Sequence, residues 1–347
     1  MTEPVTVAVD ANGADLGPAE VARGAALAAA SGSIRVLLHG PAAELGPAAA
    51  GVSIVDAPVS IAKAADPARA VRSTPEASIV RAVDAVAEGR ADALVSGGST
   101  GAALAAALFR IKRARGVHRP ALAVLVPVPG APFLLLDAGA NTEARPEHLV
   151  QFAHMGAAFM ETVLGIARPR VALLANGEEP GKGTETTIAA HEALASTGAL
   201  EFIGNVEGFA IGTGAAEVIV ADGFTGNVAL KVMEGTSAVL LGAVHDAATS
   251  SPRAKLGGLL LRPALRGLRD ELDPQEHGGA VLLGLRKLAV VPHGSFGARG
   301  IARAIEQAAR GVRDDVVGLT FERLAAAGAL RRAPDPSAAG ASVPDRS

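Results

Sequence analysis

Short apolar runs alternate along the chain with longer alanine-rich stretches, and most apolar runs end in a glycine-rich or polar turn. Continuous apolar strands that alternate with helices are typical of a buried parallel sheet. The pattern therefore predicts a Rossmann-like αβα sandwich with a mostly parallel sheet. Strands are predicted at 5–10, 34–40, 52–58, 91–98, 121–128, 133–141, 170–179, 216–224 and 288–294, and helices at 18–31, 75–89, 100–114, 146–165, 184–197, 227–248 and 298–311.

One segment, residues 249–278, interrupts this alternation. It holds few β-branched residues, and Pro263 and a Gly-Gly pair at 257–258 predict two short helices. Leucines and arginines recur there at helical spacing, which predicts an amphipathic helical protrusion. The stripe consists of Leu261, Arg262, Leu265, Arg266, Leu268 and Arg269.

The rest of residues 1–330 is predicted to form a single α/β domain. Residues 331–347 are rich in Pro, Ala and Ser, a composition that predicts a disordered tail. The first ten residues lack the basic and apolar regions of a secretory signal. Prolines interrupt the apolar stretch at 121–136, so no membrane-spanning helix is expected.

Composition narrows the chemistry. Aromatic residues make up only 3% of the chain, so the core must be built from Ala, Val, Leu and Ile. A net charge of −3 provides no general attraction to nucleic acid. The absence of cysteine excludes a disulfide, a thiolate metal site and a cysteine nucleophile, and is consistent with a cytoplasmic protein. The histidines show no metal-ligand spacing, and neither a metal nor a cofactor is expected.

Polar residues gather directly after the predicted strands, where an open parallel sheet binds its ligands. Three of these turns, at 98–101, 182–184 and 226–227, run straight into predicted helices, and the helix amides together with Lys182 would attract a phosphate or similar oxyanion. One glycine-rich turn alone is ordinary turn chemistry, but three on one sheet edge predict an anion site. The candidate binding residues are Asp10, Gly98, Ser99, Thr100, Gly101, Asp137, Asn141, Gly183, Asp222, Gly226 and His293.

The same turns resemble the motifs of the bacterial acyl-ACP:phosphate acyltransferase family (PlsX). The resemblance runs in order from about residue 5 to 311. Asn12, Ala14 and Ser99 depart from the residues usual in the family, which bears on acyl or carrier preference and on rate. The matching segments are VAVDANGADLGP, LVSGGSTGA, LLDAGANTEARPEHLVQFAHMG, LLANGEEPGKG, FIGNVEG, ADGFTGNVALKVMEG, GGAVLLGL and HGS.

This resemblance implies transfer of an acyl group from acyl carrier protein to inorganic phosphate, which feeds glycerol-3-phosphate acylation in phospholipid synthesis. It also implies a fold similar to that of the isocitrate/isopropylmalate dehydrogenase-like superfamily. Phosphate would attack the thioester directly, since neither a cysteine nor a GxSxG elbow is present. Lys182 is the first candidate for a catalytic charge and Asn227 for an oxyanion donor. Asp10, Asp137 and Asp222 would contact substrate or orient loops, and His293 would protonate the leaving thiolate or be structural.

The resemblance further implies a homodimer that lies in the cytoplasm and contacts the inner face of the membrane peripherally. The 249–278 stripe would meet the membrane or the acyl carrier protein, or pack in the dimer. A second basic cluster, at Lys112, Arg113, Arg115 and Arg119, is another candidate carrier site. A glycerol-3-phosphate acyltransferase would take the product. The alternatives are a phosphate transferase for short-chain acyl-CoA, a decarboxylating dehydrogenase and a non-catalytic membrane scaffold.

Overall fold

The computed structural model describes residues 3–331, except for the side chains of residues 265 and 268–270. From residue 332 on, the predicted tail lies outside the described residues. The described part begins with β1 (Val5–Asp10), α1 (Pro18–Ala29), β2 (Ile34–Gly40), α2 (Ala42–Leu45), β3 (Val52–Asp56), α3 (Pro67–Ser73), α4 (Ser78–Ala87), β4 (Ala93–Ser96) and α5 (Thr100–Arg110). It continues with β5 (Ala121–Val126), β6 (Phe133–Leu136), α6 (Pro146–Leu164), β7 (Arg170–Leu174), α7 (Glu185–Thr197), β8 (Glu201–Val206) and β9 (Val218–Val220).

The final third holds the two longest helices, α8 (Gly223–Thr249) and α9 (Pro252–Glu271). A strand pair, β10 (Ala280–Leu283) and β11 (Leu288–Val291), then returns the chain to the sheet before α10 (Ala298–Arg313) and α11 (Val316–Ala326). Two short 3₁₀ turns, η1 (Gly208–Ala210) and η2 (Pro274–His277), lie between these elements.

The described strands form one sheet of eleven in the order β3-β2-β1-β4-β11-β10-β5-β6-β9-β7-β8. Seven of the ten strand pairings are parallel, which confirms a mostly parallel sheet. Central strands such as β1 are buried on both faces, which explains their continuous Val and Ala runs. In β1, Val9 lies opposite Leu38 of β2 on one side and Val95 of β4 on the other.

The prediction that the glycine-rich turns share one sheet edge is wrong. The three antiparallel pairings, β11–β10, β10–β5 and β5–β6, lie side by side in the middle of the sheet. Because three reversals leave a net reversal, β6, β9, β7 and β8 run opposite to β1, β4 and β11. The carboxyl ends of β1, β4 and β11 therefore lie at one edge, and those of β6, β9 and β7 lie at the other.

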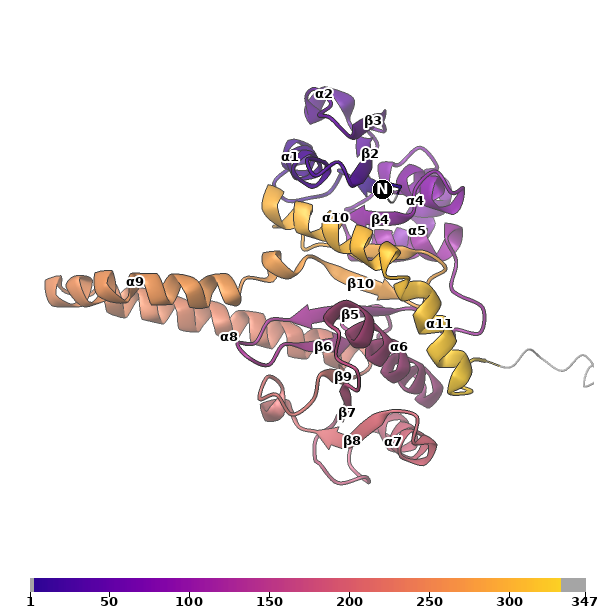
Figure 1. Cartoon of the computed structure of the whole chain (residues 1–347), viewed down its shortest axis with the longest axis vertical. Coiled ribbons are helices and arrows are strands. Elements are labelled where there is room, and N and C mark those ends of the chain that lie inside the picture. The colour runs from indigo at the N-terminus through magenta and orange to yellow at the C-terminus, as the bar shows by residue number, and fades with distance from the viewer. Residues whose placement is uncertain (1–2, 332–347) are drawn as a thin grey trace, which may run out of the picture.

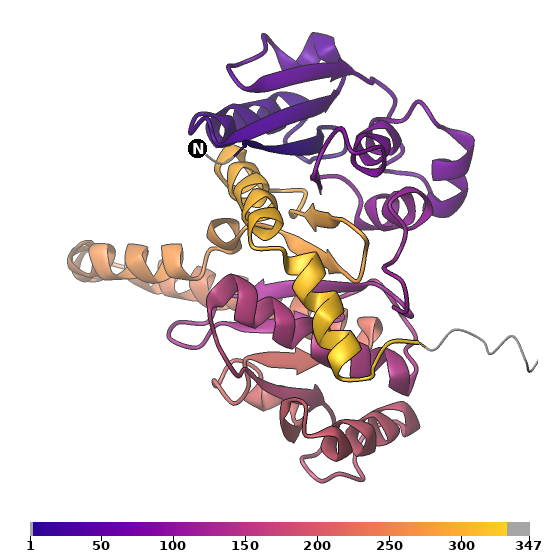
Figure 2. The same ribbon diagram turned by 45° about the vertical axis from the view of Figure 1, so that its right-hand side comes forward.

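Helices cover both faces of the sheet (Figure 2). On one face α1, α10, α11, α6 and α7 contact one another in a row, and on the other α3, α4 and α5 pack together. In α10, Ile301, Ala304, Ile305 and Ala308 are buried at positions i, i+3, i+4 and i+7, as expected of a helix with one apolar stripe. Buried Val, Leu, Ile and Ala dominate the core, as the composition predicted.

The protrusion is a hairpin of α8 and α9 that extends far from the sheet (Figure 1). It begins earlier than predicted, because the outer part of α8 belongs to it. The predicted break at Pro263 is wrong, since α9 continues through this residue as a single helix. Proline removes one helical hydrogen bond, but the surrounding turn is exposed, so the carbonyl that it frees can be solvated.

Much of the hairpin surface is apolar. Val239 is 72% exposed and Leu260 is 76% exposed, and their apolar neighbours are exposed in the same way. Three members of the predicted stripe, Leu261, Arg262 and Arg266, have exposed side chains. The side chains of Leu265, Leu268 and Arg269 lie outside the described part of the structure.

No spanning helix was expected, yet α8 is long and apolar enough to cross a membrane by length and composition alone. Its inner half packs against the rest of the fold, where Leu230 joins an apolar cluster of the sheet. Lys231 and Glu234 form an ion pair on the same half, with 2.7 Å between Nζ and Oε2. The inner half of α8 is therefore a wall of the folded domain.

Candidate functional site

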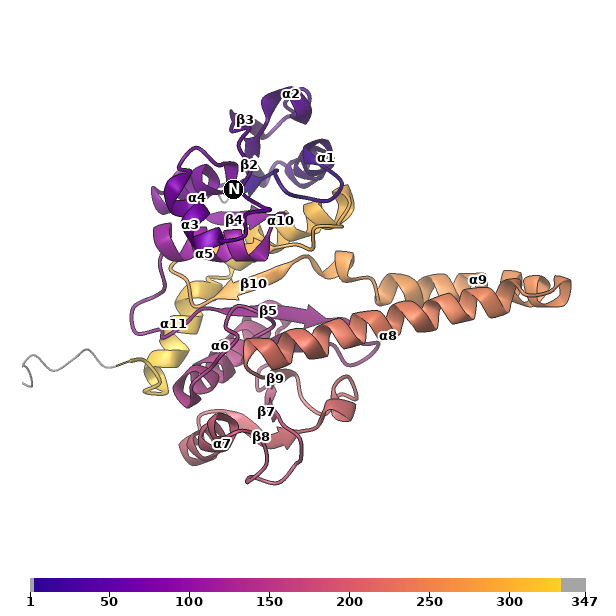
Figure 3. The same ribbon diagram turned by 180° about the vertical axis from the view of Figure 1, so that it is seen from behind.

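A cavity of about 750 Å³ lies over the sheet between α5 and α8. Figure 3 shows these two helices on the same face of the sheet. The cavity has an apolar floor from β5 and β10 and polar groups at its ends. Its lining includes Gly13, Asp15, Lys63, Gly98, Ser99, Thr100, Leu122, Val124, Leu125, Ala138, Asn227, Leu230, Lys231, Glu234, Ala280, Val291, His293, Ser295 and Phe296.

At one end of the cavity, the turn after β4 starts α5. Ser99 is the N-cap residue, and its Oγ accepts a hydrogen bond of 3.4 Å from the amide of Ala102. Among the described residues, the amides of Ser99, Thr100 and Gly101 have no hydrogen-bond acceptor. Free amides at the start of a helix form an anion-binding site. This helix start is therefore suited to hold a phosphate.

Asp10 lies beneath this turn and is 3% exposed. Its Oδ1 accepts from Ser78 Oγ at 2.6 Å and from the Asn12 amide at 3.2 Å, and its Oδ2 accepts from Ser96 Oγ at 2.8 Å. Burial raises the pKa of Asp10 to about 6, although these hydrogen bonds lower it in part. Through these hydrogen bonds the carboxylate of Asp10 connects the loops that follow β1 and β4.

Asn12, one of the departures from the usual family motif, belongs to the same network. Its Nδ2 donates to the carbonyl of Ala57 at 3.1 Å and to Ser78 Oγ at 3.0 Å. The amide is buried, and both bonds satisfy it. Asn12 therefore provides polar anchoring behind the turn and does not itself line the cavity.

Asp137 organises the opposite edge of the sheet and is fully buried. Its Oδ1 accepts from the amides of Leu122, Gly139 and Ala140 at 2.9–3.1 Å. Its Oδ2 accepts from both the amide and the side-chain nitrogen of Asn141, at 2.7 and 2.8 Å. Burial raises the pKa of Asp137 above its usual value, against the effect of these bonds. Asp137 therefore shapes the 137–141 loop and has no free oxygen to offer a ligand.

The start of α8 packs directly on this loop. Asp222 is the N-cap residue, accepting from the amide of Thr225 at 2.9 Å and from its Oγ1 at 2.7 Å. The amide of Gly223 donates to the carbonyl of Asn141 at 2.7 Å. A Cβ atom on Gly226 would lie 2.0 Å from the carbonyl oxygen of Asp137, so only glycine permits this approach. The polar groups of the 222–226 turn therefore form hydrogen bonds within the protein and hold the start of α8 in place.

Asn227 lies in the first turns of α8, because the helix begins at Gly223 and not at the predicted position 227. The N-cap residue is Asp222, and the side chain of Asn227 lines the cavity. Lys231 follows one turn later on the same helix face and also lines the cavity. Asn227 is also adjacent to Gly139 in the 137–141 loop.

Two cations of the cavity were missed by sequence reasoning. Lys231 could have been found from its i+4 spacing to Asn227 in the motif NVALK. Lys63 lies in an exposed loop between β3 and α3, and no pattern in the sequence distinguishes it from other surface lysines. Both approach the same cavity as the free helix start of α5.

His293 lies after β11 at the same edge as the start of α5. Its Nδ1 lies 2.7 Å from Ser295 Oγ and accepts a hydrogen bond of 3.3 Å from the backbone amide of Ser295. An acceptor at Nδ1 leaves the ring proton of the neutral imidazole on Nε2. His293 is exposed and lines the cavity. It can therefore present an N–H donor to a bound molecule.

Lys182 and Gly183 lie apart from this cavity, on the loop between β7 and α7. Lys182 is exposed, and its amide donates to the carbonyl of Glu179 at 3.0 Å. Thr184 caps α7 by accepting from the amide of Thr187 at 3.2 Å. The proposed catalytic role of Lys182 stays a prediction, because neither residue lines the cavity.

The structure thus sorts the predicted residues into two groups. Asp10, Asp137, Asn141, Asp222 and Gly226 hold loops and helix starts in place. The cavity itself brings together Gly98, Ser99, Thr100, Asn227 and His293, which come from both edges of the sheet. Residues from both edges line the same cavity because the cavity extends across the face of the sheet.

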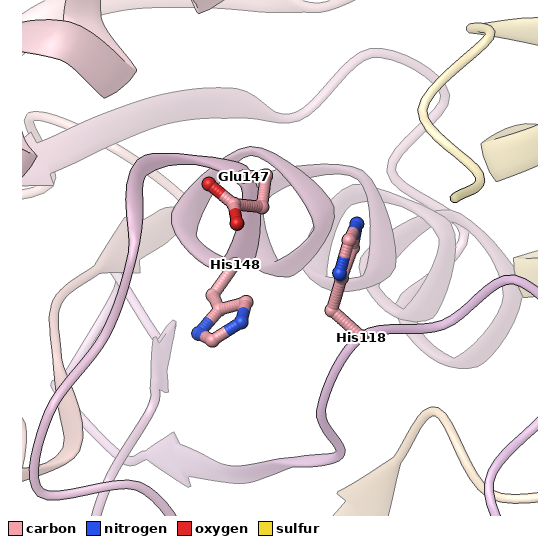
Figure 4. A group of neighbouring side chains, drawn as sticks. All are labelled: His118, Glu147 and His148. Carbon is pink, nitrogen blue, oxygen red and sulfur yellow. The ribbon is translucent and has the colours of Figure 1, made fainter. Parts of the chain in front are cut away.

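A separate cluster of His118, Glu147 and His148 has the side-chain types of a metal site (Figure 4). One potential ligand atom of each residue lies within 4.8 Å of the others. However, Nδ1 of His148 accepts the amide of Arg145 at 3.2 Å, which leaves the ring proton on Nε2. Metal-bound histidines instead donate from the second nitrogen. The cluster is therefore poorly suited to a metal.

The fold and the cavity define an α/β protein with a helix start of free amides beside an apolar floor. The fold is similar to that of a phosphotransacetylase from Streptococcus pyogenes, with a TM-score of 0.61 and 18% identity, covering 89% of this chain and 94% of the other. It is also similar to 4-hydroxythreonine-4-phosphate dehydrogenase from Klebsiella pneumoniae, with a TM-score of 0.51 and 15% identity, covering 90% and 98%.

Sequence comparison is more specific. Over residues 5–318 the chain belongs to the fatty acid synthesis protein family. It is 46% identical to the phosphate acyltransferase of Geobacillus thermodenitrificans over 319 residues, covering 90% of this chain and 97% of the relative. It is 44% identical to the phosphate acyltransferase of Thermobifida fusca, covering 87% and 86%. These findings confirm the resemblance inferred from the turn motifs.

Proposed function

We propose that the protein is a phosphate acyltransferase that moves a fatty acyl group from acyl carrier protein to inorganic phosphate. The observation that carries the proposal is the cavity, where a helix start with free amides and two lysines stands beside an apolar floor. This arrangement suits a phosphate and a long acyl chain at the same time. The 46% identity to a phosphate acyltransferase supports the same activity.

Phosphate is held at the start of α5. The amides of Ser99, Thr100 and Gly101 donate to its oxygens, and the helix dipole favours its negative charge. Lys63, from the loop beside this turn, and Lys231, from α8, supply compensating charge. Lys231 also pairs with Glu234 at 2.7 Å. The Asp10 network keeps the turn in this conformation through Ser96, whose Oγ also accepts the amide of Gly98 at 3.4 Å. Phosphate is thereby bound and oriented before the thioester arrives.

The acyl chain lies along the apolar floor. Leu122 and Val124 of β5, Leu230 of α8, and Val291 and Phe296 beside β11 form this surface. Burying a methylene group contributes about 0.8 kcal/mol, so a long chain gains far more here than an acetyl group. This preference argues against the alternative of a short-chain acyl-CoA transferase.

The reaction is a direct displacement. A phosphate oxygen attacks the thioester carbonyl carbon, the new C–O bond forms, and the carbonyl oxygen gains negative charge. Asn227 donates to that oxygen from the wall of α8. The tetrahedral intermediate collapses and the C–S bond breaks. The leaving thiolate accepts a hydrogen bond from His293 Nε2 and takes the proton carried by the attacking hydrogen phosphate. The products are an acyl phosphate and the carrier thiol.

The hairpin of α8 and α9 supplies peripheral contact with the membrane. Its exposed leucines, including Leu256 and Leu260, can enter the interface while Arg253, Arg262 and Arg266 meet anionic headgroups. In this proposal the protein is a cytoplasmic homodimer at the inner face of the membrane. Acyl phosphate is released close to the lipid surface, where a glycerol-3-phosphate acyltransferase consumes it.

A carrier-protein assay tests the reaction. Purified protein is incubated with palmitoyl-acyl carrier protein, with and without phosphate, and free thiol and acyl phosphate are measured. We expect thiol release that depends on phosphate and is matched by acyl phosphate. Acetyl-CoA serves as the competing donor. Activity with acetyl-CoA alone would refute the long-chain assignment, and no transfer to phosphate from either donor would refute the function.

A further inference from the structure

A basic groove lies on the opposite side of the molecule from the hairpin. It has a volume of about 640 Å³ and is formed by the end of α5, the 111–117 loop, the β10–β11 turn and the end of the described chain. Five of its ten lining residues are basic, and none of the lining residues is acidic. The basic members are Lys112, Arg113, Arg115, Arg286 and Arg331.

The protein backbone holds this groove in a fixed shape. The helix α5 ends with Lys112 in the left-handed region at φ 70°, and its amide reaches back to the carbonyl of Ala107 at 2.9 Å. The amide of Arg286 then donates to the carbonyl of Lys112 at 3.0 Å, and the amide of Ala114 to that of Gly284 at 2.8 Å. Segments more than 160 residues apart are thereby joined into one surface.

Gln151 anchors the other half of the groove and is 1% exposed. Its Oε1 accepts the amide of His118 at 2.8 Å, and its Nε2 donates to the carbonyls of Gly116 and Ala329 at 2.9 and 2.7 Å. The amide of Arg331 also donates to the carbonyl of Gly116 at 2.8 Å. A buried, fully bonded side chain thus fixes two of the segments that carry arginines.

The positive charges of the groove are not neutralised within the described part of the chain. Arg113 donates to the carbonyl of His118 at 2.5 Å, and Arg286 Nε donates to the carbonyl of Arg113 at 3.3 Å. Neither these two nor Lys112, Arg115 and Arg331 form an ion pair with a described acid. Among the causes that lower the pKa of His118, burial comes first, and Arg331 and Arg113 add to it.

We infer that this groove is the docking surface for the acidic acyl carrier protein. The inference rests on the proposed function, which requires such a donor. Five unpaired cations in a concave, preformed surface complement an acidic helical protein. The alternative occupant, an anionic membrane, is disfavoured by position, because the exposed leucines of the hairpin extend from the other side (Figures 1 and 3).

The groove also connects with the proposed site. Its loop continues into Pro120 and Leu122. The carbonyl of Pro120 accepts a hydrogen bond from Asn141 Nδ2, and the amide of Leu122 donates one to Asp137 Oδ1. Leu108 and Phe109 line the groove, and they belong to the same apolar cluster as Leu122 and Leu230, which line the cavity. A carrier protein docked here therefore stands beside the end of the cavity where Asn227 lies.

The test reverses two charges whose side chains make no described hydrogen bond, as Lys112→Glu with Arg115→Glu. We expect the KM for palmitoyl-acyl carrier protein and the Kd of labelled carrier protein to rise about tenfold or more, with a weaker dependence on salt. Turnover of palmitoyl-pantetheine, a donor without the protein, should stay within twofold of wild type. Unchanged KM and Kd for the carrier protein would overturn the inference.

Two further variants locate the effect. Arg35→Glu reverses an exposed charge on β2, away from both surfaces, and should leave the KM and Kd unchanged. Arg262→Glu with Arg266→Glu tests the hairpin as a competing carrier site, and a larger rise in Kd there than in the groove variant would refute the groove. Loss of binding to anionic vesicles in the groove variant, with carrier binding retained, would assign the groove to the membrane.

The Kd measurement separates this inference from the proposed function, because it needs no turnover. Tight carrier binding that the groove variant abolishes would support the docking surface even in a protein that transfers no acyl group to phosphate. Normal transfer with unaltered carrier binding in the groove variant would support the function and reject the surface.

Discussion

Replacing Gly226 with alanine is the sharpest test of how α8 is seated. A Cβ atom at this position would lie 2.0 Å from the carbonyl oxygen of Asp137 and 3.0 Å from its carbonyl carbon. Real Cβ atoms stay at least about 3 Å from such an oxygen, so the backbone of α8 or of the 137–141 loop must move by about 1 Å. The movement should also disturb the 2.7 Å bond from the Gly223 amide to Asn141.

The magnitude follows from three contributions. Overpacking costs about 1–3 kcal/mol, and a weakened buried hydrogen bond costs about 1 kcal/mol. Alanine regains about 1 kcal/mol because it favours a helix more than glycine does. We therefore expect Gly226→Ala to lower the free energy of unfolding by about 1–3 kcal/mol. Because Asn227 is the next residue, kcat should fall as well.

The same helix offers a matched control. A Cβ on Gly235 would meet nothing within 4 Å, so Gly235→Ala should raise the free energy of unfolding by up to about 1 kcal/mol. Urea denaturation measures the free energy of unfolding of both variants. Their midpoint urea concentrations are compared provided that the dependence of this free energy on urea concentration, the m value, is the same. A Gly226→Ala midpoint at or above that of wild type would refute the close approach between α8 and Asp137.

Three other predictions concern catalysis, pH and the membrane. Lys231→Ala should lower kcat/KM for phosphate by about 100-fold, and Lys182→Ala by less than tenfold, because only the first lysine lines the cavity; the reverse order in steady-state assays would support Lys182 as the catalytic charge. Burial raises the pKa of Asp10 from 3.8 to about 6, so the folded state binds more protons than the unfolded state between these values. The free energy of unfolding should therefore fall as pH rises through this window, by on the order of 3 kcal/mol from this group, and denaturation at several pH values should show that Asp10→Asn lacks this component. Leu256→Glu with Leu260→Glu should release the protein from anionic vesicles while turnover in solution is retained, and unchanged co-sedimentation with vesicles would contradict membrane contact through the hairpin.

Local patterns in the sequence predicted most elements well. The first two strands have the bounds predicted from their apolar runs, 5–10 and 34–40. Two strands were missed for physical reasons. In β8 the run EFIGNV mixes polar residues with Gly204 at φ 95° and resembles a loop. In β10 only four residues are paired, and glycines flank them.

The sequence also failed to predict the direction of the strands, which was the larger error. Each apolar run shows that a strand is buried, but β5 and β10 look the same in either orientation. The prolines between β5 and β6, which excluded a spanning helix, also mark a reversal of the chain. Motifs found Ser99, Asn227 and His293, yet the packing of α8 was needed to show that Asp222 does not line the cavity.

The reversed strands in the middle of the sheet also affect how this fold can vary. The end of the cavity proposed to bind phosphate depends on the 96–101 turn, while its floor and far wall depend on β5 and α8. Because these segments are separate in the chain and in the sheet, a substitution at Leu122 or Leu230 can alter the space for an acyl chain without disturbing the amides of α5. Acyl-chain selectivity and phosphate affinity are therefore traits that related proteins can change one at a time.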